Sequence, residues 1–311
     1  MEEYIRQRDK VLDYIDANLN RAMTLDELAA VSCYSKYHFS RLFLSTMGET
    51  VFQYIHRLRL ERAAKWIDIE ADTPITDIAY ELGFSNCANF SRSFKEHFGS
   101  SPSRWRSARK ELKSREMERL DIGLQSGDDN DRSIFLNDKD LSWPYELRGG
   151  IRVRVRIQDV GELPIVYLRY IGASLGSHER FEYAYESLVQ WAVNRGLPGI
   201  PAGETYAVYH DNPLITDESK LRISVGFEAP AGVEAGGRVG KMALAGGKYA
   251  VAEFEYETRD EYISVYTFLY GYWLSRFGYI PDIRRYDHVC FIGSPSGKIL
   301  KIRLRLPVKF V

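Results

Sequence analysis

The fold is decided by the stretch Ser35-Lys36-Tyr37-His38-Phe39-Ser40-Arg41-Leu42-Phe43, which the chain contains twice. It returns as Ser85-Asn86-Cys87-Ala88-Asn89-Phe90-Ser91-Arg92-Ser93-Phe94, and each copy runs on to a glycine, Gly48 or Gly99. The offset is 50 residues at Ser35 and Ser85 and 51 from Phe39 and Phe90 onward, so the second copy carries one extra residue near its start. Two copies of one small helical unit therefore lie in the first third of the chain.

Each copy predicts a helix-turn-helix unit. In the first copy Thr24 begins a capping box, and in the second copy Thr73 is the expected N-cap, with Pro74 at the first helical position. Apolar residues then recur at helical spacing. A short turn leads to a second helix, for which Ser35 or Ser85 is the expected cap.

The second helix of each unit has two different faces. Phe39 and Phe43, with Leu42, are expected in the core of the first unit, and Phe90 and Phe94 in that of the second. The opposite face presents an arginine among small polar residues, which suits reading of the major groove because arginine bridges the O6 and N7 atoms of guanine. For either copy alone, the alternative is a small helical hairpin with a solvated arginine. The candidate DNA-binding residues are Lys36, Tyr37, Ser40, Arg41, Asn86, Cys87, Ala88, Asn89, Ser91 and Arg92.

Residues 51–68 predict one uninterrupted helix between the two copies, about 27 Å long at 1.5 Å per residue. Successive major grooves on one side of DNA are about 34 Å apart, a distance that such a helix and its flanking units can span. The apolar stripe steps to the nearly opposite side of this helix between Leu58 and Leu60, so each half can pack on one unit. The rest of its surface is expected to be a solvated face, or a set of phosphate contacts, formed by Arg57, Arg59, Arg62 and Lys65.

Residues 5–106 resemble the DNA-binding domain of the AraC/XylS family, in particular its MarA/Rob branch. The matching segments are residues 35–43, Ile78-Ala79-Tyr80-Glu81-Leu82-Gly83-Phe84 and Phe94-Lys95-Glu96-His97-Phe98-Gly99-Ser100-Ser101-Pro102. The resemblance implies sequence-specific transcription regulation, in which the polar faces of the two second helices enter adjacent major grooves. Cys87 and Ala88 depart from the pattern, because relatives near MarA carry longer polar side chains there. This departure predicts weaker base reading by the second copy.

Length and charge bound the remaining possibilities. A chain of 311 residues has room for a second domain beside a helical one of about 110 residues. The net charge of −1 excludes a general polyanion binder, so DNA affinity has to come from the placement of charge and is expected to depend strongly on salt. A basic cluster that follows the second copy is expected to be a solvated helix end or a phosphate track: Arg104, Arg106, Arg109, Lys110, Lys113 and Arg115.

Cysteine usage and hydropathy predict a cytoplasmic protein with no membrane partner. The three cysteines show no CxxC pairing, no apolar run reaches membrane-spanning length, and the first residues do not form a signal peptide. No cofactor is expected. His288 and Cys290 share one face of a predicted strand, but two ligands do not make a metal site.

Changes in composition divide the chain into a DNA-binding domain at 1–110, a linker at 111–150 and a second domain at 151–311. Much of the linker is polar and acidic. Its apolar islands, residues 134–136 and 141–145, are expected to dock on a domain.

From Ile151 onward the hydrophobic period becomes two, which predicts one-faced strands at 151–157 and 300–306. Two amphipathic helices are expected at about 179–194 and 260–277, the second announced by a capping box at Thr258. Matching segments recur within this half at offsets of 81 to 82 residues, as between Phe181 and Tyr262 or Tyr206 and His288. The fold class is therefore a multidomain chain, with an all-α tandem helix-turn-helix domain and an α+β domain of two strand-helix-strand-strand repeats.

Aromatic side chains near the pseudo-twofold of this repeat predict a pocket for a small lipophilic molecule. The alternative for each of them is a place in an aromatic core. The aromatic candidates for ligand binding are Tyr206, Tyr249, Tyr266, Tyr270 and Trp273.

Residues 151–311 are similar to the GyrI-like effector-binding domain. The resemblance rests on Tyr209-His210-Asp211-Asn212-Pro213, Lys220-Leu221-Arg222, Gly247-Lys248-Tyr249-Ala250-Val251 and Trp273-Leu274. Drug binders of this family often carry a buried glutamate six residues before a late proline, but that position is Val289 here. Asp287, on the same strand face, either replaces the glutamate as a sixth candidate residue or lies on the surface. Without it the pocket would prefer neutral or anionic ligands, with Arg284 and Arg285 close by.

The function that these patterns predict is a DNA-binding transcription regulator, expected to be an activator, that responds to a small-molecule effector. Its expected partners are double-stranded DNA with two adjacent major-groove segments, the effector and RNA polymerase. The alternatives are that the second domain hydrolyses small molecules or docks on a protein. Against an enzyme, Gly293-Ser294-Pro295-Ser296-Gly297 puts proline where a nucleophile elbow would need its serine.

Overall fold

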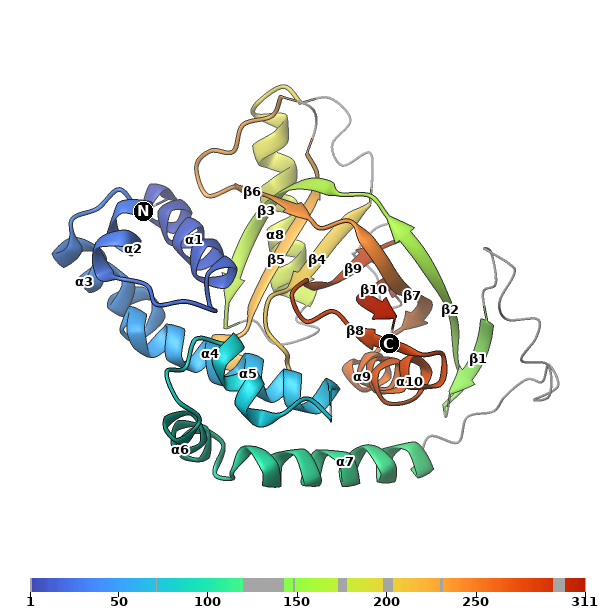
Figure 1. Ribbon diagram of the computed structural model, residues 1–311. Coiled ribbons are helices and arrows are strands. Elements are labelled where there is room, and N and C mark those ends of the chain that lie inside the picture. The colour runs from blue at the N-terminus through green and yellow to red at the C-terminus, as the bar shows by residue number, and fades with distance from the viewer. Residues whose placement is uncertain are drawn as a thin grey trace. The chain divides into compact units, whose positions relative to one another are not determined.

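The computed structural model describes residues 2–70, 72–119, 143–147, 149–172, 178–197, 204–229, 232–292 and 300–310. The chain separates into two compact units (Figure 1). The first comprises Met1–Leu112 with the short segments Leu214–Thr216 and Ala235–Gly240. The second comprises Lys113–Pro213, Asp217–Glu234 and Lys241–Val311.

The first unit is helical, as predicted. Its helices are α1 (Glu2–Ala17), α2 (Leu25–Val31), α3 (Lys36–Met47), α4 (Val51–Ile69), α5 (Ile75–Glu81), α6 (Cys87–Phe98) and the first part of α7 (Pro102–Arg119), which continues beyond Leu112. α2 with α3 and α5 with α6 form the two helix-turn-helix units, and α4 runs between them (Figure 1). The predicted boundary at residue 110 falls inside α7.

The two apolar stripes of α4 are buried as predicted. In the first half, the ring of Tyr54 meets that of Phe43 of α3 edge-on at 5.4 Å. In the second half, Leu60 and Ile67 share a core cluster with Phe90 and Phe94 of α6. α4 is therefore a common wall of both helix-turn-helix units, and a capping box between Thr50 and Gln53 starts it.

The prediction of an exposed basic face on α4 is wrong. Arg57 is only 6% exposed, and its Nη2 lies 2.6 Å from Glu49 Oε1 while its Nη1 lies 3.1 Å from both carboxylate oxygens of Glu61. Burial opposes the charge on Arg57, but the Glu49 hydrogen bond and the two carboxylates outweigh it and raise its pKa. Arg62 Nη2 lies 3.6 Å from Asp16 of α1. Lys65 is half-buried. A helix enclosed on two opposite sides leaves little surface for a solvated face, so its cations are paired inside the unit.

Arg59 joins three segments of the first unit through backbone carbonyl groups. Its Nε donates to Leu19 at 2.9 Å, its Nη2 to Arg21 at 2.6 Å and its Nη1 to Gly83 at 3.2 Å. Leu19 and Arg21 follow α1, whereas Gly83 lies in the turn before α6. One side chain of α4 thus fixes a part of each half of the unit.

Part of the basic cluster on α7 is structural too. Trp105 Nε1 donates to Asp68 of α4 at 2.8 Å, and Arg109 pairs with the same carboxylate at 3.1 Å. Arg106 donates to the carbonyl of Thr73 at 2.6 Å. Arg104 and Lys110 are exposed. The cluster therefore anchors α7 to the second helix-turn-helix unit as well as presenting charge.

Two of the predicted helix caps are shifted. Ser35 caps α3 as expected, but the cap of α6 is Asn86 rather than Ser85, because the Asn86 side chain accepts from the Asn89 amide at 2.8 Å. α5 begins at Ile75, so Pro74 occupies the cap position that was predicted for Thr73. The Thr73 hydroxyl instead donates to Glu70 at 2.9 Å.

The second unit is built on an antiparallel sheet, which confirms a sheet-rich domain with helices. Its strands are β1 (Trp143–Leu147), β2 (Ile151–Val160), β3 (Leu163–Ile171), β4 (Thr205–Tyr209), β5 (Arg222–Glu228), β6 (Gly240–Leu244), β7 (Gly247–Tyr256), β8 (Tyr279–Pro281), β9 (Asp287–Phe291) and β10 (Leu300–Phe310). The sheet order is β1-β2-β7-β10-β9-β4-β5-β3-β6, with β8 paired to β10. β1 lies within the range predicted as linker, pairs with β2 and buries Tyr145 in the core, so the expected docking is confirmed for Tyr145. Residues 134–136 lie outside the described residues.

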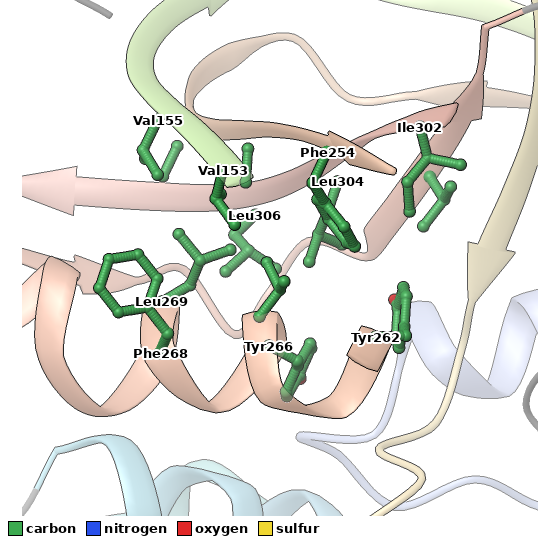
Figure 2. Packing of buried hydrophobic residues seen from close by; sticks show 14 of the residues in the cluster. Val153, Val155, Phe254, Tyr262, Tyr266, Phe268, Leu269, Ile302, Leu304 and Leu306 are labelled. Atoms are coloured by element: carbon green, nitrogen blue, oxygen red, sulfur yellow. The ribbon is translucent and has the colours of Figure 1, made fainter. Parts of the chain in front are cut away.

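Helices cover one face of this sheet. α8 (His178–Val193) packs on β3 and β5, and its Phe181 meets Phe291 of β9 at 4.3 Å between ring centroids. α9 (Arg259–Phe268) contributes Tyr262 and Tyr266 to the buried cluster that also contains Phe254 and Leu304 of the strands (Figure 2). The opposite face buries a second cluster, formed by Ile165, Tyr167, Tyr206, Val208, Leu244 and Cys290.

The second predicted helix of this domain is interrupted. Its capping box at Thr258 and Glu261 is present. α9 is followed by a π-helical turn, η3 (Leu269–Trp273), and then by α10 (Leu274–Arg276), where a single helix over 260–277 was expected. Such single π turns inside α-helices are rare, and the regular helical spacing of the apolar residues predicts an uninterrupted helix here.

The contact between Gly83 and Arg59 predicts an unequal response to alanine at two matched glycines. Gly83 has φ +77°, and a Cβ there would lie 2.8 Å from Arg59 Nη2 and 3.0 Å from the Leu19 carbonyl oxygen. Gly99 has φ +74° and nothing within 4 Å of such a Cβ. We expect Gly99→Ala to lower the free energy of unfolding by about 1 kcal/mol and Gly83→Ala by about 2–4 kcal/mol, because only the latter disturbs the Arg59 hydrogen bonds. Urea unfolding of the full chain, followed by helical circular dichroism, measures both; equal losses would contradict the role of Arg59.

Candidate DNA-binding face and ligand site

α3 presents the predicted polar face to solvent. Phe39 and Phe43 are buried, whereas Tyr37 is 91% exposed and Arg41 is exposed. Ser40 is half-buried beside them. Positions three and four apart lie on one side of a helix, so Tyr37, Ser40 and Arg41 form one surface. This surface has the chemistry for base contacts, with one bidentate donor, one hydroxyl and one large ring.

α6 presents a smaller face of the same design. Phe90 and Phe94 are buried, whereas Ala88, Asn89 and Arg92 are exposed. The remaining candidates on this helix are half-buried, with Cys87 Sγ 4.0 Å from Ser91 Oγ. The Asn86 side chain is used by the cap. Arg92 is therefore the longest polar side chain among the candidate residues of this helix.

The charges of the two faces are differently engaged. Lys36 Nζ lies 2.6 Å from Asp26 in an exposed pair, which is weak and screened by salt. Arg41 and Arg92 have neither a hydrogen bond nor an ion pair with any described residue. Their guanidinium groups can therefore bind DNA without first breaking an internal interaction.

The helix-covered side of the sheet holds a buried carboxylate among tyrosines. Asp287, at the start of β9, is 6% exposed, and its Oδ2 accepts from Tyr266 Oη at 3.1 Å and from Tyr270 Oη at 2.8 Å. Tyr266 belongs to α9 and Tyr270 to the π-helical turn. The rings of these two tyrosines lie 4.5 Å apart.

Two further tyrosines complete this group, which we call the Asp287 cluster: Asp287, Tyr209, Tyr262, Tyr266 and Tyr270. Tyr209 of β4 is the cross-strand partner of Asp287, and its ring lies 6.3 Å from that of Tyr262. Burial raises the pKa of Tyr209 to about 12. Burial, and then the charge of Asp287, hold the pKa values of Tyr266 and Tyr270 well above the usual range.

The structure does not bring the six predicted ligand-binding residues together. Tyr206 is the cross-strand partner of Cys290. Side chains alternate between the two faces along β9, so Cys290 and Tyr206 point to the face opposite Asp287. Tyr249 lies on that opposite face as well, 5.2 Å from the ring of His288, and its hydroxyl donates to the Ala245 carbonyl at 2.5 Å. Trp273 is 2% exposed within the main core. Of the six, Asp287, Tyr266 and Tyr270 are joined to one another by hydrogen bonds.

Sequence reasoning missed Tyr209 and Tyr262 as neighbours of Asp287. Both were visible in repeated segments, and Tyr209 heads the Tyr-His-Asp-Asn-Pro motif. The β4–β9 register is what places Tyr209 opposite Asp287, and Tyr262 joins them from α9 through its ring contact with Tyr209. Arg285 was considered as a pocket cation and is instead committed elsewhere. It pairs with Asp282 at 2.9 Å and donates to the carbonyls of Gly246, Lys248 and Val308.

The opposite face contains a buried histidine and a buried cysteine. Burial, and then the charge of Arg305, lower the pKa of His288 to about 4. Burial also raises the pKa of the Cys290 thiol. Across the described residues, no group of three or more His, Cys, Asp or Glu side chains is arranged to hold a metal ion.

Family models match both halves of the chain. A helix-turn-helix domain model matches residues 28–108. A model described as a GyrI-like small molecule binding domain matches residues 154–309, half of the chain.

Curated relatives match the first half. PqrA of Proteus vulgaris, a probable transcription factor, is 39% identical over 98 residues, which cover 31% of this chain and 80% of PqrA. The chain is an AraC-family transcription regulator that carries a GyrI-like domain. This AraC-family chain is also 34% identical over 97 residues to the transcriptional activator AarP of Providencia stuartii, covering 31% of this chain and 71% of AarP. It is 33% identical over 96 residues to the right origin-binding protein of Escherichia coli K12, where the match covers 31% of this chain and spans a third of the length of that relative.

Within the described ranges of this AraC-family regulator, no helix is long and apolar enough to cross a membrane.

The tyrosines of the GyrI-like domain predict a loss of stability in alkali. Their raised pKa values keep them protonated in the folded domain, while the unfolded chain releases protons near pH 10. The stabilisation is thus complete below pH 10 and is lost as the pH rises through about 12. We expect the melting temperature to fall across this interval, and to fall less steeply in Tyr209→Phe. A melting temperature that stays constant from pH 10 to 12 would contradict the burial of these hydroxyls.

Proposed function

We propose that this AraC-family regulator activates transcription when a lipophilic cation binds the Asp287 cluster of its GyrI-like domain. The observation that carries the proposal is a buried carboxylate that receives the hydroxyl groups of Tyr266 and Tyr270. In the proposed division of labour, residues 1–110 bind DNA, residues 111–150 link the domains and residues 151–311 bind the effector.

The internal repeat is part of this proposal. In the sheet order, β3, β5 and β4 correspond to β7, β10 and β9, and the two sets of three strands are joined by the pairing of β4 with β9. α8 follows β3, and α9 follows β7. This order supports two strand-helix-strand-strand repeats, with the Asp287 cluster beside their junction, since Asp287 and Tyr209 are partners across it.

The proposed DNA contacts are unequal between the two copies. Tyr37, Ser40 and Arg41 read bases in the first major-groove segment, with Lys36 nearby. The second copy relies on Arg92, because Ala88 is short and the Asn86 side chain caps its own helix. Its remaining contacts, through Cys87, Asn89 and Ser91, are close to the helix surface and suit phosphates better than base edges.

This inequality predicts different effects of the two arginines. We expect Arg41→Ala to relax sequence preference in the first segment by about 1–3 kcal/mol, because it removes a bidentate contact to guanine. We expect Arg92→Ala to weaken binding to different sites more evenly. Binding of the full chain to a randomised DNA pool, followed by sequencing, measures both. A larger loss of selectivity in Arg92→Ala would reverse the assignment.

A cationic effector follows from the physical chemistry of the Asp287 cluster. Burying a carboxylate among aromatic rings costs free energy unless partners compensate for it. A delocalised cation can both pair with the carboxylate and lie against the negative faces of the tyrosine rings. The tyrosine hydroxyls stabilise the charge of Asp287 in the free protein and can be displaced by the ligand.

The π-helical turn supports such displacement. Tyr270 lies in the turn, next to Gly271, whereas Tyr266 lies in regular helix just before it. Single π turns inside α-helices occur frequently at functional sites, and Gly271 gives the backbone beside Tyr270 additional conformational freedom. A shift of Tyr270 would open Asp287 without unfolding α9.

The charge of the effector can be tested with two ions of the same shape. Tetraphenylphosphonium and tetraphenylborate differ mainly in the sign of their charge. We expect only the cation to raise the melting temperature of the full chain, and Asp287→Asn to abolish this shift because it removes the charge. Glu255→Gln, at an exposed position of β7, is the control and keeps the shift. Equal stabilisation by both ions, or an unchanged shift in Asp287→Asn, would refute a cation site at Asp287.

We further infer that the second domain binds its ligand without catalysis and that the protein acts on RNA polymerase. Ser224 Oγ lies 2.8 Å from His210 Nε2, a spacing that suits a nucleophile and its base. Ser224 is, however, fully buried and also accepts from Arg169 Nε at 3.1 Å, so no substrate reaches it.

Ligand-dependent transcription by purified polymerase tests the proposed activation, and unchanged transcript levels at saturating tetraphenylphosphonium would contradict it.

A further inference from the structure

The base-reading face of α3 continues one turn beyond Arg41 and becomes apolar there. Leu44 lies three residues after Arg41 and seven after Tyr37, so all three side chains share one side of the helix. Leu44 is 47% exposed, although it follows directly on the buried Phe43. An exposed leucine at this place extends the face without contributing to the core.

A second apolar side chain stands beside Leu44. Phe52, in the first turn of α4, is 50% exposed. A surface groove of about 880 Å³ joins the two, and Tyr37, Ser40 and Arg41 also line it. The apolar patch and the candidate base-reading residues therefore line the same groove.

The second helix-turn-helix unit carries a charged residue at the position that corresponds to Leu44. α3 and α6 are both 12 residues long and end at Gly48 and Gly99, so Leu44 corresponds to Lys95. Lys95 is exposed. A lysine at the end of the reading face suits a phosphate, whereas a leucine offers nothing to a phosphate.

The chemistry of the major groove limits what an apolar patch can contact beside a base-reading arginine. The base edges there carry hydrogen-bond donors and acceptors, and the thymine C5-methyl is the apolar group among them. We propose that Leu44, supported by Phe52, reads thymine methyl groups at one end of the first major-groove segment. This inference rests on the proposed reading of that segment by α3. It adds a specificity for thymine that a face of Tyr37, Ser40 and Arg41 alone does not supply.

Replacing thymine by deoxyuridine tests the proposal, because it removes the methyl group and leaves base pairing intact. The full chain is first used to select its preferred site from random DNA. Each thymine of that site is then replaced in turn, and affinity is measured. We expect one or two thymines of the α3 segment to weaken binding about fourfold when replaced, the effect of one buried methyl group.

Two variants assign the effect to its residue. Leu44→Ala should bind the thymine and uracil sites with equal affinity at these positions, because the contact with the methyl group is gone. Leu44 and Phe52 are both exposed, so circular dichroism suffices to check the folding of the variants. Lys95→Ala is the matched control in the second copy. It should keep the discrimination between thymine and uracil, and reduce the slope of log affinity against log salt by about 1.

The outcomes separate the inference from the proposed function. If Arg41→Ala alters preference in the α3 segment but no thymine is sensitive to its methyl group, the inference fails and the DNA-reading face stands. A sensitivity that persists in a Leu44→Ala, Phe52→Ala double variant also overturns the inference and leaves the patch to a protein partner. If Arg41→Ala changes no preference in that segment, reading by α3 fails, and the inference fails with it.

Discussion

The first unit depends on the enclosure of α4 between the two helix-turn-helix units. Its two apolar stripes are buried on nearly opposite sides, and its arginines are therefore turned inward, where each needs acceptors. Arg57 finds them in Glu49 and Glu61, and Arg59 in three backbone carbonyls. Removing one partner of such a buried pair typically costs about 3–5 kcal/mol, although an apolar replacement of the whole pair can be neutral. The arrangement thus contributes a fixed geometry more than net stability.

That geometry has a functional consequence. Arg59 connects the end of α1 with the turn before α6, and Glu49 lies at the junction of α3 and α4. Movement of one helix-turn-helix unit against the other would break charged hydrogen bonds on both sides of α4. Two recognition helices on a rigid helix can meet two successive major-groove segments in one chain, which a regulator with a single unit achieves by dimerisation. The spacing of the two segments is then set by the fold and not by an oligomeric interface.

The sequence predicted the elements well and the environment of their polar side chains poorly. The duplicated block, the helical periods, the step of the apolar stripe on α4 and the capping boxes at Thr24 and Thr258 are local patterns, and the structure contains them all. Arg57 was wrongly predicted to be exposed. Its burial depends on the packing of α4 against other helices on two sides, and a short window of sequence contains no information on that packing. The cap of α6 moved from Ser85 to Asn86 for a smaller reason: both side chains can cap, and the turn decides between them.

The candidate ligand site shows the same limit in a sheet. Strand alternation assigned Asp287 and Val289 to one face correctly, but whether Tyr206 or Tyr209 joins them depends on the pairing of β4 with β9, a long-range register. An error of one residue in the register of β4 would move its side chains to the other face of the sheet. The internal repeat shows only that the segments around Tyr206 and His288 correspond, and does not give the register between them. The π-helical turn at Tyr270 is a further feature that the sequence did not predict, because the apolar spacing over residues 260–277 indicates one regular helix.

The two halves of the first unit show how a duplicated fold can diverge in specificity. Buried positions are the same on both helices, Phe39 with Phe90 and Phe43 with Phe94, because each packs against α4 or its neighbours. Exposed positions differ between the copies: Tyr37 aligns with Ala88, and Leu44 aligns with Lys95. A rigid scaffold keeps such substitutions from altering the spacing of the two readers. Each face is then free to take its own chemistry: one with an exposed aromatic and an exposed apolar side chain on α3, and one on α6 with a short Ala88 and a lysine in the place of Leu44.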